Sequence, residues 1–214
     1  MRVLLVNTYY TPEIMGGAEY SVKKLAEGLS AAGIQVKVLC TGDVYTEETI
    51  DGIDVVRIVP NNLCRIYHAP EKSKVVLHLR EYQDIWNKRN ESKIKAVMEE
   101  FKPDVVHSNG LYDLTPIVWK VAREKDARVV HTLRDYFLCC PRVNYGCEGE
   151  FKNCLFRFPL CVMHRHANKK HTAYVDCVTA PSEITLNTLL DQGFFSESDH
   201  RVVPNATDIN AEEI

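Results

Sequence analysis

Residues 2–19 read RVLLVNTYYTPEIMGGAE, a short apolar run followed by a loop and two glycines. The run Arg2–Val6 is almost wholly aliphatic, which is typical of a strand buried on both faces of a sheet. Beyond the glycines, apolar residues recur at the spacing of an amphipathic helix: Ala18, Val22, Leu25, Ala26 and Leu29. Gly33 then stands where a glycine often closes a helix. The stretch predicts the opening strand, loop and helix of an α/β fold.

The same alternation of short strands and helices continues along the chain. Further strands are predicted at Val36–Cys40, Ile53–Val59, Val105–His107, Val129–Thr132, Cys177–Ala180 and Val202–Val203. Helices are predicted at Lys74–Lys102, Thr115–Lys125, Arg165–Tyr174 and from Ser182 to Leu190, with an irregular segment over Leu133–Cys161. This order predicts a single Rossmann-like α/β domain with a doubly wound parallel sheet and right-handed crossovers.

Composition excludes several classes of protein. The 214 residues carry a formal net charge of −3, with 45% hydrophobic and 26% charged residues. This balance argues against disorder and against a nucleic-acid partner, which usually needs a strongly basic face. No apolar run approaches the ~20 residues that span a bilayer, and the first residues do not resemble a signal peptide. We therefore expect a cytoplasmic protein whose eight cysteines are mostly reduced.

In parallel sheets of this kind, ligands bind at the carboxyl ends of the strands, so the residues after each strand are the candidate site. Gly16 and Gly17 open the first helix, where free backbone N–H groups and the helix dipole favour a phosphate or a sugar. The pair is also compatible with a flexible loop that only starts a helix. Its spacing does not fit G-x-G-x-x-G, so a dinucleotide cofactor is not predicted.

Two histidines stand at the ends of neighbouring predicted strands. His107 precedes Ser108-Asn109-Gly110, and His131 precedes Thr132-Leu133-Arg134-Asp135. We expect the diglycine turn and His131 to line one edge of the sheet, with both histidines in a shared cleft, although a strand-end histidine also fits a structural role. His131 can donate a hydrogen bond to a sugar hydroxyl or a phosphate oxygen. Asp135 can orient it, accept a proton from an acceptor hydroxyl, or simply cap the loop.

The irregular segment is rich in cysteine. Four cysteines recur every seven residues, at Cys140, Cys147, Cys154 and Cys161. The prolines and glycines between them argue against one continuous helix, so we expect a loop that carries four thiols. A metal or iron–sulfur site, disulfides and plainly reduced cysteines all remain open, because the spacing lacks the close pairs usual in zinc sites. We therefore assign no metal ligand and no cofactor.

Five segments match a known family in order and spacing. They are Met15-Gly16-Gly17-Ala18-Glu19, Asp104-Val105-Val106-His107, His131 to Tyr136 with Cys140-Pro141-Arg142, Ala180-Pro181-Ser182-Glu183, and Val202 to Asp208. The chain resembles the N-terminal, acceptor-side domain of family 4 glycosyltransferases, which have the two-domain GT-B fold. The match covers residues 1–204 as the domain and 205–214 as the start of an interdomain linker. Ala206 departs from the family pattern, which usually has glycine there.

The resemblance implies a retaining transfer of a sugar from a nucleotide-sugar donor to a hydroxyl acceptor, without a metal. The acceptor is a glycan, a glycolipid or a small molecule, and in many members it is lipid-linked. A basic stretch, His164–His171, then has two interpretations. It is either a solvated helix face or a surface for a phosphate-rich acceptor or the anionic inner face of a membrane, which implies peripheral membrane contact.

The resemblance also implies roles for individual residues. The family's glycine loop approaches the reaction centre, which implies that Gly16 and Gly17 bind substrate. The histidine after the fifth strand contacts donor or acceptor, which implies a catalytic role for His131, with Asp135 beside it. Further substrate-binding candidates in the matching segments are Glu19, His107, Asn109 and Arg134.

In this family, a C-terminal domain binds the nucleotide-sugar, and we expect it to continue beyond Ile214 or to belong to a partner chain. Without it, the chain lacks groups that would stabilise charge on the leaving diphosphate, so we expect no turnover. Two other hypotheses stay open. One is a non-catalytic acceptor-binding subunit that works with a separate donor-binding chain, and the other is an unrelated α/β protein that binds a small phosphate compound.

Overall fold

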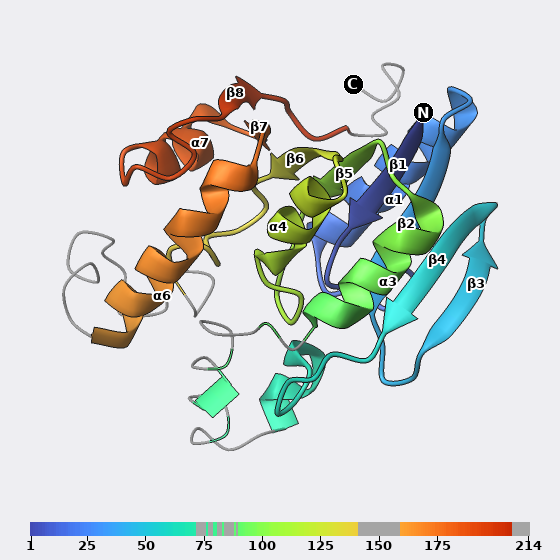
Figure 1. The fold of residues 1–214 in the computed structure, drawn as a ribbon, viewed down its shortest axis with the longest axis horizontal. Coiled ribbons are helices and arrows are strands. Elements are labelled where there is room, and N and C mark those ends of the chain that lie inside the picture. Colours follow the sequence, from blue (N-terminus) through green and yellow to red (C-terminus); the bar gives the residue numbers. More distant parts are fainter. Residues whose placement is uncertain are drawn as a thin grey trace, which may run out of the picture.

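A computed structural model describes residues 1–71, 76, 79–80, 83, 88, 90–140 and 159–206. Within this part of the chain lies one eight-stranded sheet with the order β3-β4-β2-β1-β5-β6-β7-β8 (Figure 1). The strands are β1 (Arg2–Val6), β2 (Gln35–Thr41), β3 (Thr46–Ile50), β4 (Ile53–Ile58), β5 (Val105–Ser108), β6 (Arg128–Thr132), β7 (Cys177–Ala180) and β8 (Asp199–Val202). Every neighbouring pair except β3–β4 is parallel. The predicted Rossmann-like α/β fold is confirmed.

The expectation of an entirely parallel sheet is wrong at one edge. β3 pairs antiparallel with β4, and the turn Asp51-Gly52, with φ of 51° and 79°, joins them. A two-residue turn with positive φ at both positions returns the chain directly alongside itself. β3 has the sequence TEETI and is exposed over its first four residues, so no hydrophobic pattern marks it as a strand.

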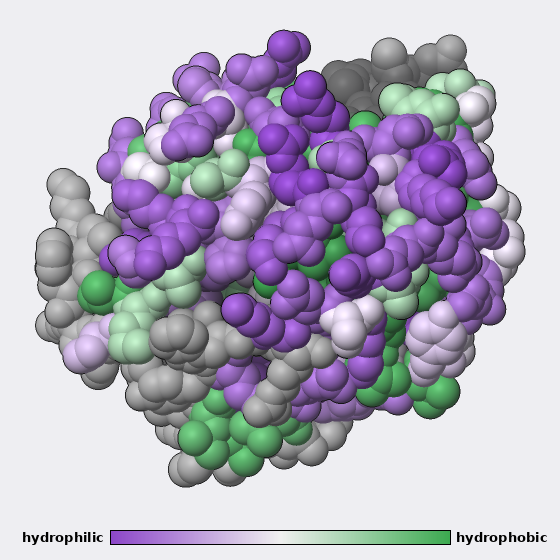
Figure 2. Space-filling view, in the orientation of Figure 1, coloured by the Kyte–Doolittle hydropathy of each residue, from purple (hydrophilic) through white to green (hydrophobic). Residues whose placement is uncertain are grey.

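Alternate residues of the strands form two separate cores. Val3 and Leu5 pack with Val22 of α1 (Gly17–Ala31) on one face. Leu4 and Val6 pack on the opposite face, which is covered by α3 (Glu91–Phe101), α4 (Ile117–Glu124) and α7 (Glu183–Leu190). The side of the molecule in front of α3 and α4 is mostly hydrophilic (Figure 2), so these helices are amphipathic layers over a sheet that is buried on both faces.

The predicted helix over 74–102 is interrupted in the structure. The described residues 76, 79–80 and 83 are helical, residue 88 is not, and α3 begins at Glu91; a 3₁₀ turn, η1 (Ile66–Glu71), lies earlier in the chain. Asn90 precedes α3 in a turn, where its side chain accepts from Asn61 N (2.9 Å) and donates to Asp113 O (2.6 Å). Lys102, with φ of 51°, closes the helix before Pro103.

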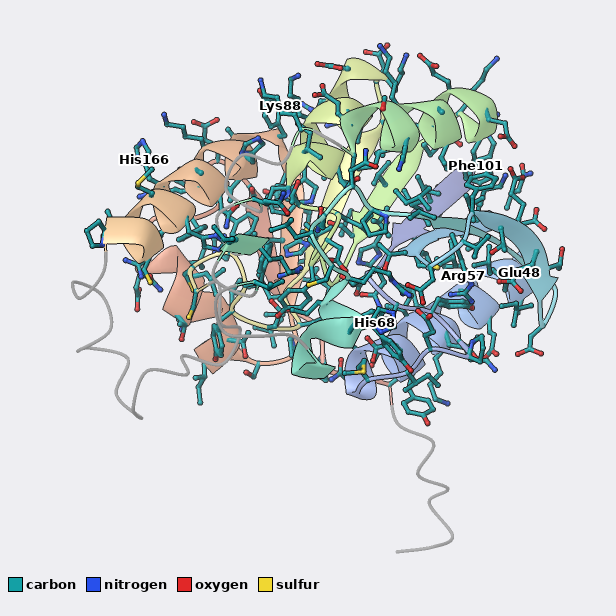
Figure 3. All side chains as sticks on the ribbon, turned by 90° about the horizontal axis from the view of Figure 1, so that it is seen from below. Glu48, Arg57, His68, Lys88, Phe101 and His166 are labelled. Atoms are coloured by element: carbon teal, nitrogen blue, oxygen red, sulfur yellow. The ribbon has the colours of Figure 1, made fainter. Side chains whose placement is uncertain are left out.

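The last third of the chain follows the prediction closely. Ser182 caps α7 by accepting a hydrogen bond from Thr185 N (3.3 Å), and Gly193, with φ of 74°, follows it. The basic helix is α6 (Pro159–His171), continued by η2 (Thr172–Tyr174). His166 points outward from it in Figure 3, and Lys169 and Lys170 are exposed.

One residue of the basic stretch is not on the surface. His164 is fully buried, and its Nε2 lies 2.6 Å from the carbonyl oxygen of Phe137. Asn168 is buried one turn later and donates to Leu138 O (3.1 Å). The inner face of α6 therefore binds the loop after β6, and the outer face of the basic stretch, with His166, Lys169 and Lys170, is exposed.

A buried carboxylate fastens the segment after β4 to the domain. Asp113 is fully buried and accepts from Arg80 Nη2 (2.6 Å), Asn62 Nδ2 (2.9 Å) and Ile66 N (3.1 Å). Arg80 is itself only 3% exposed. Breaking a buried charge pair from one side costs far more than losing a surface pair, because the remaining charge stays desolvated.

We expect Asp113→Asn to lower the free energy of unfolding by roughly 3 kcal/mol. Asparagine tolerates the positive φ of 60° at this position, so the effect would report the lost charge rather than backbone strain. Urea denaturation would measure it. As a control, Glu99→Gln removes an exposed partner of Lys125 and should leave the unfolding curve nearly unchanged. Equal curves for the two variants would contradict the prediction.

Candidate functional site

Polar residues just beyond the ends of β1, β5 and β6 form a hydrogen-bonded line at the carboxyl edge of the sheet. Gly110 N donates to Asn7 Oδ1 (2.7 Å), and Asn109 N donates to Val6 O (2.8 Å). Arg134 Nε donates to Asn109 Oδ1 (3.1 Å). A Cβ added at Gly110 would lie 2.9 Å from Asn7 Oδ1, so a larger residue would have to displace the Asn7 amide that accepts this hydrogen bond. The predicted substrate-binding residues Asn109 and Arg134 are thus brought together at the expected edge.

The guanidinium of Arg134 is partly exposed, and its described hydrogen bonds go to neutral groups. Besides Asn109, it donates through Nη1 to Asn205 Oδ1, in the chain after β8. Burial lowers the pKa of Arg134, and among the described residues no carboxylate acts on it. A partly desolvated cation without a carboxylate partner favours an anionic ligand.

An amide donor next to this cation has no partner among the described residues. Asn109 is 2% exposed, and its Nδ2 is buried with no hydrogen bond to this part of the chain. An unsatisfied buried donor costs free energy, which a ligand oxygen would recover. The sequence identifies Asn109 only as a residue after a strand; its orphan amide is visible only in the structure.

His131 is enclosed, and the expectation that it lines an open cleft is wrong. The side chain is 4% exposed, with Trp119 edge-on at 4.9 Å and Phe195 stacked at 5.9 Å between ring centroids. Its Nδ1 lies 2.9 Å from Ser108 Oγ, which also accepts from Trp119 Nε1 (2.8 Å). Burial lowers the pKa of His131 to about 3, so the imidazole is neutral. Its catalytic role stays a prediction, to which this geometry lends no support.

The two histidines do not share a cleft. In the parallel register His107 lies beside Val130, and Ser108 lies beside His131, so the imidazoles point to opposite faces of the sheet. His107 Nε2 is hydrogen-bonded to Thr132 Oγ1 (2.7 Å) on the face of the sheet that α1 covers. Burial lowers the pKa of His107 to about 4. His131 pairs with Ser108, one residue after His107, and this offset places the two imidazoles on opposite faces. The offset is visible only once the strand register is known.

The diglycine turn is exposed, whereas the carboxylate of Glu19 that follows it is already hydrogen-bonded. Gly16 and Gly17 are exposed, and nothing lies within 4 Å of a Cβ built at either position. Glu19 is 7% exposed, and its Oε2 accepts from Gly16 N (2.8 Å). Glu19 therefore caps α1, and its role in substrate binding stays a prediction.

Asp135 caps the loop after β6. Its Oδ1 accepts from Phe137 N (2.8 Å), and the phenol of Tyr112 lies against the same carboxylate. Burial raises the pKa of Asp135 to about 6, although the hydrogen bond from Phe137 N and the nearby phenol of Tyr112 act in the opposite direction. The capping alternative is what the structure shows, and a role in proton transfer stays a prediction.

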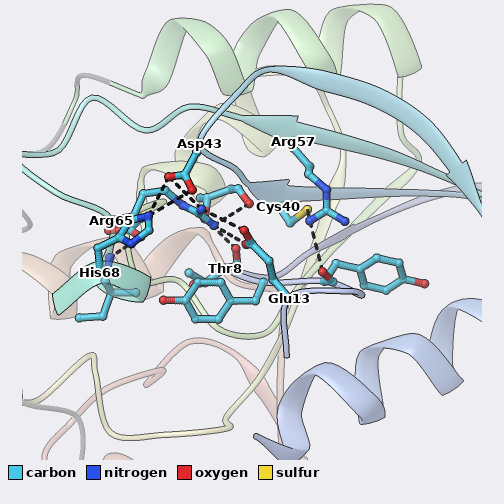
Figure 4. Close-up of polar contacts among 12 residues, drawn as sticks. Thr8, Glu13, Cys40, Asp43, Arg57, Arg65 and His68 are labelled. Carbon is cyan, nitrogen blue, oxygen red and sulfur yellow. Dashed lines mark hydrogen bonds and ion pairs between the residues drawn. The ribbon is translucent and has the colours of Figure 1, made fainter. Parts of the chain in front are cut away.

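Two buried arginines at the same edge are absent from the predicted site. Arg57 on β4 and Arg65 after it contact the loop between β1 and α1 (Figure 4). Arg57 could have been found from the sequence, because an arginine stands out in the largely apolar strand IDVVRI. No pattern in the sequence marks Arg65.

Half of the predicted cysteine set, Cys147 and Cys154, lies outside the described residues. Cys140 is buried and Cys161 is partly buried. In the ranges that the structure describes, no three His, Cys, Asp or Glu side chains are grouped to hold a metal. None of the described helices is long and apolar enough to cross a membrane.

Comparison with known proteins identifies the family of the chain. The family described as Glycosyltransferase Family 4 matches residues 15–211. The chain belongs to glycosyltransferase family 4. An uncharacterized 42.6 kDa protein from the cps region of Klebsiella pneumoniae is 28% identical over 219 residues, covering 98% of this chain and 56% of that protein. An uncharacterized glycosyltransferase of Methanocaldococcus jannaschii is 39% identical over 61 residues, covering 28% of this chain and 16% of that protein.

Solved structures share the fold of this family 4 chain. The catalytic domain of starch synthase IV from Arabidopsis thaliana aligns with a TM-score of 0.56 and 15% identity, over 96% of this chain and 52% of that one. The UDP-GlcNAc 2-epimerase of Methanocaldococcus jannaschii aligns with a TM-score of 0.50 and 14% identity, over 96% and 46%. The chain thus spans about half the length of these proteins.

We expect the stability of the protein to fall as pH rises through about 4 to 6 because of Asp135. The pKa is about 6 in the folded state and 3.8 when unperturbed, so in this window the folded state holds a proton that the unfolded state has lost. The loss across the window would be of the order of 3 kcal/mol.

Urea denaturation of the native protein and of Asp135→Asn from pH 4 to 7 would measure this effect. Other titrating groups, such as His107, cancel in the difference between the two proteins. The native protein should lose stability relative to the variant as pH rises. Two curves that stay parallel would show that the carboxyl titrates normally.

Proposed function

We propose that this chain is the acceptor-side half of a retaining glycosyltransferase, which transfers a sugar from a nucleotide-sugar donor to a hydroxyl acceptor. Family membership supports sugar transfer as the reaction class. The resemblance to family 4 implies that the transfer is retaining. The observation that carries the site is the cation of Arg134 beside the orphan amide of Asn109. The starch synthase of the same fold was solved with ADP and acarbose, which are ligands of the proposed class.

In this proposal, Arg134 supplies the cationic donor of the acceptor-side half. Its planar fork suits phosphate oxygens and neighbouring sugar hydroxyls. Asn109 holds Nε of the guanidinium and offers its free N–H to the same ligand. Donors that are already in place when charge develops on a leaving diphosphate lower the barrier without further reorganisation. The open N-terminus of α1 at Gly16 and Gly17 lies at the start of the same sheet edge and would receive a ligand oxygen.

His131 has an indirect role in this proposal. Through Ser108 and the surrounding aromatic rings it fixes the end of β6, and Arg134 follows two residues after that strand ends. The acceptor is a sugar or a lipid-linked sugar, and the donor-binding half lies in a further domain or partner chain. We place the protein in the cytoplasm, with peripheral contact at the inner face of the membrane.

We expect Arg134→Met, in the longer protein that carries the donor-binding half, to lower kcat/KM by roughly 10²- to 10³-fold. The reason is the loss of the donor that faces the developing charge. The measurement is sugar transfer from a panel of nucleotide-sugars to glycan and lipid-linked acceptors.

Arg128→Met is the matched control for this measurement. Arg128 is the first residue of β6, the strand that precedes Arg134. It lies at the opposite edge of the sheet, where it pairs with Asp176 (2.9 Å). Its loss should leave kcat/KM within about twofold. Arg134→Met with activity equal to that of the control would sink the proposed site.

Residues 1–214 alone should not transfer sugar, since in this proposal the groups that stabilise charge on the leaving diphosphate belong mainly to the donor-binding half. The assay supplies nucleotide-sugar and acceptor and follows nucleoside diphosphate release, with the longer protein as the positive control. Transfer by the 214-residue chain at a rate comparable to that of the longer protein would contradict the division of labour proposed here.

A further inference from the structure

The loop between β1 and α1 carries the diglycine turn, and its first half is firmly folded. Tyr10 is 1% exposed, and its carbonyl oxygen accepts from Glu13 N (3.1 Å). The second half, from Met15 to Gly17, is exposed. The position of the open glycines therefore depends on how residues 10–13 are held against the sheet.

Arg57 reaches this loop from β4, across the intervening strand β2. Its Nη1 donates to Tyr10 O (3.2 Å) and its Nη2 to Thr11 O (2.5 Å), so one guanidinium binds two consecutive carbonyls. Glu48 of β3 accepts from Nε (2.7 Å), and the two side chains lie next to each other in Figure 3. Arg57 is only 7% exposed. A lysine cannot make this two-pronged contact, because its charge is a single point on a flexible stem.

Arg65 holds the next part of the same loop. Its Nη1 donates to Glu13 Oε1 (3.1 Å) and its Nη2 to Glu13 Oε2, a bidentate pair (Figure 4). Nη2 also donates to Thr41 O (3.1 Å) at the end of β2, and Asp43 Oδ1 lies 3.1 Å from Nη1. The arginine is 5% exposed. The loop is thereby fastened to the end of a central strand by a partly buried, geometrically specific pair.

We infer that Arg57 and Arg65 are positioning residues for sugar transfer: together they fix residues 10–13 and so place the diglycine turn at the carboxyl edge of the sheet. The inference rests on the proposed function of that turn. All three of their loop acceptors, two carbonyls and one carboxylate, precede Gly16 by only three to six residues. Misplacing a substrate-binding segment by a small distance is enough to slow a reaction strongly.

Backbone amide exchange tests the clamp without any activity assay. In Arg57→Lys and in Arg65→Lys, the amides of Glu13 and Gly16 should exchange about tenfold faster, while those of β5 and β6 stay as protected as before. Glu13→Gln removes the Arg65 pair from the loop side and should act likewise, without touching the sheet. Arg123→Lys, which weakens an exposed pair with Asp176 at the opposite edge, is the control and should leave the loop unchanged.

Kinetics of the longer protein test the consequence. Arg57→Lys should lower kcat about tenfold with a smaller change in donor KM, because the loop still forms but is placed less often in the productive position. Loop exchange that stays unchanged, or that rises equally with the exchange of every strand, would overturn the inference, as would a loosened loop with unchanged kcat. If the native longer protein transfers no sugar, the proposed function fails, and the exchange experiment still decides whether the clamp exists.

Discussion

The parallel pairing of β1 with β2 on one side and β5 on the other is the constraint on which the rest of the structure depends. It brings the carboxyl ends of the central strands to one edge, where Gly110 N donates to Asn7 Oδ1 and Asn109 N donates to Val6 O. It also fixes which side chains point to which helical layer, since residues in register share a face. The orientation of His131 follows in the same way from the pairing of β5 with β6.

The charges at this edge divide into two kinds. Arg57, Arg65 and Arg80 each have a carboxylate of the same chain, so their positive charge is used within the fold. Arg134 contacts amide oxygens instead, and its pKa reflects desolvation alone. Because a buried pair gives little net stability but a defined geometry, the first three serve to shape the edge, and the fourth leaves charge available for a ligand.

Much of the fold was predictable because its signals are local. The aliphatic run of β1, the capping Ser182 and the closing Gly33 and Gly193 are each readable from a few residues. β3 was not, since a polar edge strand needs only backbone pairing and shows no hydrophobic alternation. The site divides in the same way. Arg134 and Asn109 were found by their place after a strand, whereas the opposite orientations of His107 and His131 depend on a register that no single segment encodes. The capping role of Glu19 was readable as a helix-start pattern but was assigned to ligand binding instead.

The polar character of β3 has a further consequence for the behaviour of the protein in concentrated solution. An outer strand offers unpaired backbone groups to any other chain, and a flat apolar one promotes aggregation. Here the outer strand is short, exposed and carries Glu47 and Glu48, while the strand at the other end of the sheet, with the sequence DHRV, is equally short, exposed and polar. Strand addition by a second molecule would bring like carboxylates together at the first of these borders. The β3 edge of the sheet is therefore protected against edge-to-edge polymerisation by the same polar sequence that hides this strand from pattern recognition.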